Sequence, residues 1–164
     1  LKFLNKNFKS EATIGIPVWG DPSLYDSTLR IGEKVRKKIE NSSLQMISGI
    51  SSPHVLTSSF GIPFNEIGEP VMITTGRKLR EDGWPKEVGT IFVMLDGDCS
   101  FASLDEPNLY IWWGAYLGLD RETLLEGKLE ETKNNIIELR RKLRNKFGWI
   151  MDIYKIQQIR HKEI

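Results

Sequence analysis

The sequence has 164 residues, of which 40% are apolar and 27% charged, and its 23 basic side chains balance 22 acidic ones to a net charge of +1. This length and composition are typical of one globular domain with its own core and exclude an intrinsically disordered chain. The near-neutral charge gives no general attraction to nucleic acid, and the single cysteine, Cys99, excludes an intrachain disulfide and a cysteine-based metal cluster. We therefore expect 1–164 to form a single α+β domain.

The sequence predicts a soluble, cytoplasmic protein. Residues 1–10 mix apolar side chains with lysines and lack the continuous apolar run of a signal peptide. No later stretch approaches the roughly 20 apolar residues that cross a bilayer, so no membrane association is expected. Glutamine is scarce beside many Ile, Lys and Glu residues, a bias that resembles that of heat-adapted proteins.

The first part of the chain is patterned as a strand, a helix and a second strand. Apolar and other residues alternate over 12–19, which predicts a strand. Apolar residues recur at helical spacing over 24–41, with most basic residues on other faces, which predicts an amphipathic helix. Residues 44–50 read as a second strand. The following segment, 51–68, is rich in Ser, Gly and Pro, and we expect a long loop there.

The middle of the chain contributes three more predicted strands. Two of them, 70–75 and 89–95, are joined by a polar stretch. The third, 109–117, is the most apolar run of the sequence and carries apolar residues on both faces of a strand. It should therefore be buried on both sides of a sheet.

The last part of the chain is patterned as a helix and a strand. A helical region is expected from Asp120, interrupted at Gly127, with the main helix over about 129–147. Gly148 is well placed as its left-handed cap. Beyond it, 149–159 is predicted to be a closing strand, with continuation of the helix as the alternative.

This order of elements is compatible with an α+β fold of the ferredoxin-like type, βαββαβ with extra strands. Its sheet would be mainly antiparallel, with two principal helices packed on one face.

The most unusual local feature is the set of aromatic residues in 109–117. Tyr110, Trp112 and Tyr116 share one face if the segment is a strand. Aromatic side chains with polar tips are favoured in pockets and interfaces, although they also fill ordinary cores. The preferred hypothesis is a non-catalytic domain that uses this strand to bind a small apolar ligand or a second copy of itself.

The loop predicted at 51–68 is included in this surface. His54 lies within it, and Trp84 lies in the polar stretch before the second central strand. We assign both residues to the ligand- or partner-binding set. His54 has serines nearby, but no nucleophile-elbow motif supports catalysis there. No cofactor is predicted.

A first alternative is a divalent-metal-dependent enzyme. Asp96 and Asp98 flank a glycine directly after a predicted strand, with Asp105 and Glu106 a few residues further on. Hard divalent cations prefer several carboxylate oxygens, and a turn can bring these together. Cys99 lies beside this loop, but no histidine is close in the sequence to activate it.

A second alternative is nucleic-acid binding through two basic segments, 36–38 and 140–146. Both fall near expected helix ends, where the helix dipole stabilises cations without any nucleic acid. Nucleic acid is therefore disfavoured, and self-association or a small apolar ligand is the expected partner.

Overall fold

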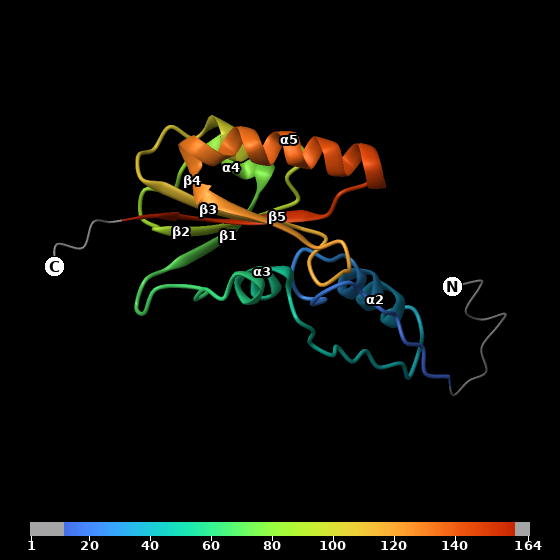
Figure 1. Ribbon diagram of the computed structural model, residues 1–164. Coiled ribbons are helices and arrows are strands. Elements are labelled where there is room, and N and C mark those ends of the chain that lie inside the picture. Colours follow the sequence, from blue (N-terminus) through green and yellow to red (C-terminus); the bar gives the residue numbers. More distant parts are fainter. Residues whose placement is uncertain (1–11, 160–164) are drawn as a thin grey trace. The chain divides into compact units, whose positions relative to one another are not determined.

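The computed structural model describes residues 12–159, and the chain falls into two compact units, Leu1–Ser51 and Ser52–Ile164 (Figure 1). The segment 1–10, where no signal peptide is expected, lies outside the described residues. Whether the two units fold as one domain stays a prediction. No helix within 12–159 is long and apolar enough to span a membrane.

The first unit contains one described helix, α2 (Thr28–Arg36), which confirms the amphipathic helix over a shorter span. The two strands predicted at 12–19 and 44–50 are wrong, because both segments are irregular. Their apolar side chains stay in solvent, as in Ile16, which is 57% exposed, and Ile47, which is 79% exposed. A strand forms only beside another strand, and the described part of this unit contains none.

The second unit is built on a five-stranded mixed sheet with the order β1-β2-β5-β3-β4. The strands β1 and β2 run parallel, and every other neighbouring pair runs antiparallel. The five strands are β1 (Val71–Thr75), β2 (Thr90–Met94), β3 (Leu109–Ala115), β4 (Thr123–Lys128) and β5 (Asp152–Gln158). Those predicted at 70–75, 89–95, 109–117 and 149–159 are confirmed.

Helices cover both faces of this sheet. The helices α4 (Gly76–Asp82) and α5 (Leu129–Phe147) lie on one face, and α3 (Ser52–Phe60) lies on the other (Figure 1). The ferredoxin-like prediction, an antiparallel α+β fold with two helices on one face, is therefore wrong. The fold is a mixed sheet between two helical layers.

Three elements were not predicted from the sequence, and their presence explains why the fold differs from the ferredoxin-like one. The helix α4 occupies the stretch expected to be a polar connection, and a helical crossover allows β1 and β2 to run parallel. The helix α3 occupies the expected loop 51–68, where Pro53 suits a first helical turn. The strand β4 occupies the start of the expected helical region and pairs with β3 through Gly127.

The core lies mainly between the sheet and α5. Trp113, Ile111 and Tyr154 are among its most buried side chains, and Ile136 of α5 packs onto them. A second cluster under α3 contains Leu56. Gly148 ends α5 with a φ of +81°, which favours glycine, but the expected left-handed cap is wrong because its ψ of −124° lies outside the left-handed helical region.

Candidate functional site

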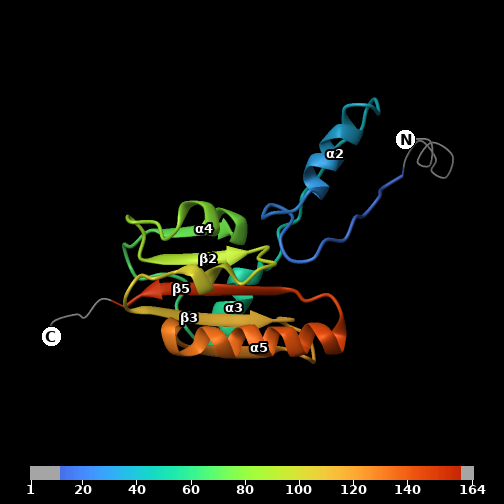
Figure 2. The ribbon, with the colours of Figure 1, turned by 90° about the horizontal axis from the view of Figure 1, so that it is seen from above.

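The carboxyl ends of β2 and β3 lie at the same edge of the sheet. Figure 2 shows both arrowheads pointing to this edge, while β5 points the opposite way and α5 ends there. Two loops, 95–99 and 116–122, leave the sheet at this edge. In open α/β sheets, ligands bind outside the carboxyl ends of the strands, because loops from neighbouring strands meet there. We call these two loops the carboxyl-edge loops.

Backbone conformation marks both carboxyl-edge loops. Leu95 directly follows β2 and Tyr116 directly follows β3, and each has a φ of +54°. Cys99 has the same φ. Residues other than glycine rarely adopt this left-handed conformation and keep it only where the surroundings hold them. Leu95 is 67% exposed, so an apolar side chain is held in solvent at this edge.

A buried carboxylate fixes the first carboxyl-edge loop. Asp96 accepts hydrogen bonds from the Tyr154 hydroxyl at 2.6 Å, from the Ser100 amide at 2.6 Å and from the Ser100 hydroxyl at 2.8 Å. The Arg80 guanidinium lies 3.4 Å from the same carboxylate. A Cβ atom on Gly76 would lie 2.3 Å from the carboxylate, so glycine is required there.

A second buried group holds the same loop from α5. The Arg140 Nε donates to the Asp152 carboxylate at 2.8 Å, and the indole of Trp113 donates to the same carboxylate at 3.0 Å. The remaining guanidinium nitrogens of Arg140 donate to the backbone carbonyls of Asp96 and Gly97, each at 3.2 Å. One arginine therefore links α5, β5 and the loop after β2.

Burial dominates the titration of these groups. It raises the pKa of Asp152 above its ordinary value, although the hydrogen bond from Arg140 opposes the shift. Burial raises the pKa of Tyr154 well above its ordinary value, with the charge of Asp96 as the next cause. It also raises the pKa of Cys99 to about 11, so this thiol is protonated at neutral pH and is a poor nucleophile.

The first unit has a comparable arrangement of its own. Gly20, with a φ of +83°, and Asp21 form a turn after segment 12–19, and the Gly49 amide donates to the Asp21 carboxylate at 2.8 Å. A Cβ atom on Gly49 would lie 2.3 Å from the Gly20 carbonyl. The ends of segments 12–19 and 44–50 therefore meet, and only glycine allows this approach.

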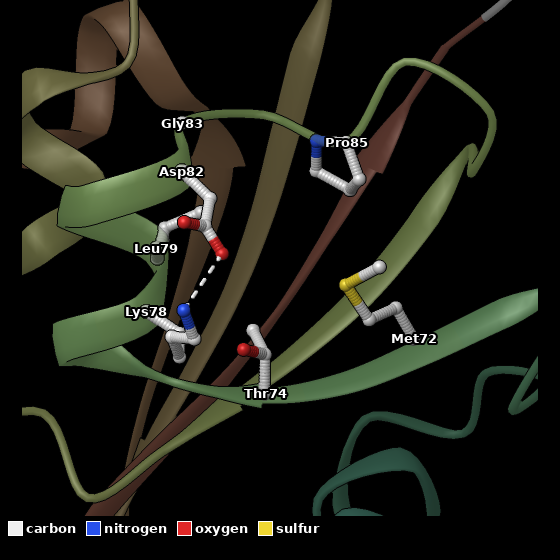
Figure 3. Close-up of a pocket in the computed structure, with 7 residues that line it drawn as sticks. All are labelled: Met72, Thr74, Lys78, Leu79, Asp82, Gly83 and Pro85. Carbon is white, nitrogen blue, oxygen red and sulfur yellow. Dashed lines mark ion pairs between the residues drawn. The ribbon is translucent and has the colours of Figure 1, made fainter.

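A separate cavity lies beside α4, between its side chains and β1 (Figure 3). Its lining includes Met72, Thr74, Leu79 and an ion pair of 3.3 Å between Lys78 and Asp82. Its volume of about 80 Å³ is room for only a few water molecules. It is too small for an organic cofactor, so the carboxyl-edge loops are the better candidate site.

The structure separates the aromatic residues that we grouped on 109–117. The rings of Tyr110 and Trp112 lie 4.5 Å apart on the face that carries α3, and both are half-buried. The ammonium group of the buried Lys155 lies 4.9 Å from the centre of the Trp112 ring. Tyr116 lies beyond the end of β3, where its left-handed backbone takes it off this face, and it is buried.

The other two residues of this predicted set lie apart from each other. Trp84 is buried in the main core. His54 belongs to α3 and stacks on Phe64 with 4.8 Å between ring centres. Their ligand- or partner-binding role stays a prediction.

The acidic residues do not converge on a common point. Asp96 and Asp98 both contact Arg80, and Asp98 is largely exposed. Across residues 12–159, the structure brings together no three His, Cys, Asp or Glu side chains that could hold a metal ion, and this includes Asp105 and Glu106.

Comparison with known proteins gives the family of this chain. Residues 2–133 match the family of tetrapyrrole (corrin/porphyrin) methylases. The chain belongs to this family.

Two more similar proteins are related to this chain over most of its length. Over 156 residues, the chain is 45% identical to a precorrin-6A synthase (deacetylating) from Sinorhizobium sp., covering 94% of this chain and 59% of the relative. The structure is similar to that of CobF, a cobalamin synthesis related protein from Corynebacterium diphtheriae, with 42% identity and a TM-score of 0.82 over 87% of this chain and 60% of that one. The chain thus spans about three-fifths of the length of these relatives.

A more distant structure shows the fold alone. Uroporphyrin-III-C-methyltransferase from Thermus thermophilus is 14% identical, with a TM-score of 0.58 over 85% of this chain and 61% of that chain.

These comparisons overturn the predicted function. A non-catalytic ligand-binding or self-associating domain is wrong, because the family and its named relatives are biosynthetic enzymes. For the first alternative, a metal-dependent enzyme on 96–106, the structure brings together no metal-binding group within 12–159. For the second alternative, a nucleic-acid binder, the family match indicates a tetrapyrrole methylase instead. The sequence drew attention to the first carboxyl-edge loop only as a candidate metal site, through its Asp-Gly-Asp turn, which is common in proteins, and it gave no signal for the second loop.

Proposed function

We propose that the protein is a methyltransferase that forms precorrin-6A, with removal of an acetyl group. The observation that carries this proposal is the 45% identity over 156 residues to a precorrin-6A synthase of the deacetylating type. The 42% identity to CobF, a cobalamin synthesis related protein, supports a role in cobalamin synthesis. The substrate would then be a corrin precursor, and the location would be cytoplasmic.

The residues present fit S-adenosylmethionine as the methyl donor. A structure of the distant Thermus methyltransferase contains S-adenosylhomocysteine, the demethylated form of this cofactor. In the present chain, Leu95 offers an exposed apolar surface, and a Cβ on Gly97 would meet nothing within 4 Å. When bound, the cofactor supplies an electrophilic methyl group.

The chain's own residues would bind the substrate and the cofactor and hold them in the orientation needed for methyl transfer. Asp96 and Asp152 are occupied by hydrogen bonds from protein groups, so they hold the first carboxyl-edge loop in place. Preorganised loops reduce the entropy lost when two reactants are brought together. In a methyltransferase the cofactor would carry the reactive methyl group, and the protein would position it.

Methyl transfer can be tested with S-adenosylmethionine carrying a deuterated methyl group. The protein is incubated with this cofactor and with a corrin precursor extract, and both the tetrapyrrole mass and released acetate are measured. The proposal predicts one labelled methyl group in precorrin-6A and acetate in equal amount. Unlabelled tetrapyrrole, in an extract that a known precorrin-6A synthase does methylate, would contradict it.

A further inference from the structure

A group of aromatic and basic side chains lies beside the second carboxyl-edge loop. We call Tyr116, Arg121, Lys146, Phe147 and Trp149 the cation–aromatic patch. It joins the loop after β3 to the end of α5, at the edge where both terminate (Figure 2).

The patch is built by ring contacts. The Arg121 guanidinium carbon lies 4.6 Å from the centre of the Tyr116 ring and 5.5 Å from that of Phe147. The Lys146 ammonium lies 4.9 Å from the same Phe147 ring. The Tyr116 and Phe147 rings meet edge to face at 5.9 Å, and the Tyr116 hydroxyl donates to the Trp149 carbonyl at 3.3 Å. These contacts orient both cations.

In the part of the chain that the structure describes, neither cation of the patch pairs with a carboxylate. Within residues 12–159, no ion pair of 4.0 Å or less joins Arg121 or Lys146 to an acidic side chain. Lys142, one turn earlier on α5, shows the ordinary alternative and pairs with Glu138 at 2.8 Å. Two positive charges that share one aromatic ring are thus left for an external anion.

A shallow pocket adjoins Arg121. It is lined by residues 118–121 and has a volume of about 340 Å³, within the range of small-ligand sites. The Gly118 amide donates to the Glu122 carboxylate at 2.7 Å, which engages that acid within the loop. Asp120 also lines the pocket and opposes an anion there. Trp149, 76% exposed, adds a flat apolar surface.

We propose that the cation–aromatic patch binds a carboxylate-bearing side chain of the tetrapyrrole substrate. Arg121 would bind the carboxylate with two parallel hydrogen bonds, Lys146 would add charge, and the exposed rings would contact the apolar part of the macrocycle. Arg121 would therefore be a specificity-determining residue. This inference rests on the proposed function, which names the substrate class.

Binding of uroporphyrin III, a carboxylate-rich tetrapyrrole, tests the patch without requiring turnover. Its fluorescence is titrated with the wild-type protein and with Arg121→Gln and Lys146→Gln. We expect Arg121→Gln to weaken binding about tenfold or more and Lys146→Gln to weaken it less. The control Lys142→Gln removes the same charge from a paired lysine and should bind as the wild type does. Asp120→Asn should strengthen binding.

Three results would overturn the inference. They are wild-type affinity in Arg121→Gln, an equal loss in Lys142→Gln, and displacement of the porphyrin by oligothymidylate at the same concentration, which would indicate a general polyanion surface. The proposed function fails separately. If Arg121→Gln loses porphyrin binding but the wild-type protein transfers no methyl group, the binding role of the patch stands and the proposed methyl-transfer reaction is rejected. If Arg121→Gln transfers methyl groups with an unchanged KM for the tetrapyrrole, the proposed reaction stands and the binding role of the patch is rejected.

Discussion

The Tyr154 hydroxyl of β5 donates a hydrogen bond of 2.6 Å to the Asp96 carboxylate in the loop after β2, across 58 residues of sequence. This bond ties a central strand to the loop that we place at the ligand-binding edge. Because both groups are buried, this bond satisfies the Tyr154 hydroxyl and adds to the bonds that Asp96 accepts from Ser100.

Tyr154→Phe should remove this bond with little change in shape. We expect a loss of about 1–2 kcal/mol in the free energy of unfolding, because Asp96 keeps its bonds from Ser100 but loses one donor. Urea denaturation measures this change. Unchanged stability would show that the bond contributes nothing net, and the loop would then need another anchor.

Arg140→Ala should destabilise the second unit by about 3–5 kcal/mol at neutral pH, because it leaves the buried Asp152 carboxylate without its cation. Arg141→Ala is the matched control, since Arg141 is exposed and should change stability by less than about 0.5 kcal/mol. Thermal unfolding of the two variants gives the comparison, and equal effects would contradict the structural role of Arg140.

The loss in Arg140→Ala should also depend on pH. Burial already raises the pKa of Asp152 in the folded protein, so the folded state binds more protons than the unfolded state between the unfolded and folded pKa values. Asp152 therefore contributes most to stability below its unfolded pKa, and this contribution is lost as pH rises through its folded value. Without Arg140 the pKa should rise further, and the variant should recover part of its lost stability on acidification. A loss that is constant from pH 4 to pH 7 would exclude this linkage.

Gly76→Ala should be destabilising by about 1–3 kcal/mol, because the new methyl group would overlap the Asp96 carboxylate, which several hydrogen bonds hold in place. Gly89→Ala is the control, since a Cβ there would meet nothing within 4 Å. The difference in denaturation midpoint between the two variants reports the clash, and a stable Gly76→Ala would mean that Asp96 can move.

Cys99 should react slowly with iodoacetamide at pH 8. Burial raises its pKa to about 11, so the thiolate fraction is small and should grow only as pH approaches that value. Mass spectrometry gives the alkylation rate, with free glutathione as the reference. Reaction as fast as that of glutathione would contradict the burial of this thiol.

The strands 70–75, 89–95 and 109–117 and the helix ending at Gly148 could be predicted, because their apolar residues repeat at the period of the element. The helix α4 was missed because its seven residues, five of them charged, follow β1 directly and look like a polar turn. That omission changed the predicted topology, since only a helical crossover makes β1 and β2 parallel. The segments 12–19 and 44–50 were predicted as strands but are irregular. Alternating apolar residues predict a strand, but they do not show whether another strand lies beside it to form hydrogen bonds.

Less of the candidate site than of the fold could be predicted from the sequence. Tyr110, Trp112 and Tyr116 were grouped by alternation, but the strand ends at Ala115 and the left-handed Tyr116 departs from the pattern. The proposed role of Arg121 depends on its contact with the Phe147 ring, which also contacts Lys146 and which joins the loop after β3 to the end of a helix 26 residues further on. No spacing rule could have shown that convergence.

Hydrogen exchange with bound S-adenosylhomocysteine tests most directly whether the carboxyl edge of the sheet holds the ligand. At saturating ligand, verified by calorimetry, we expect slower exchange of amides in 95–99, and no change in 72–74 or 82–85 around the small cavity. Protection confined to the small cavity, or no binding at millimolar ligand, would contradict it.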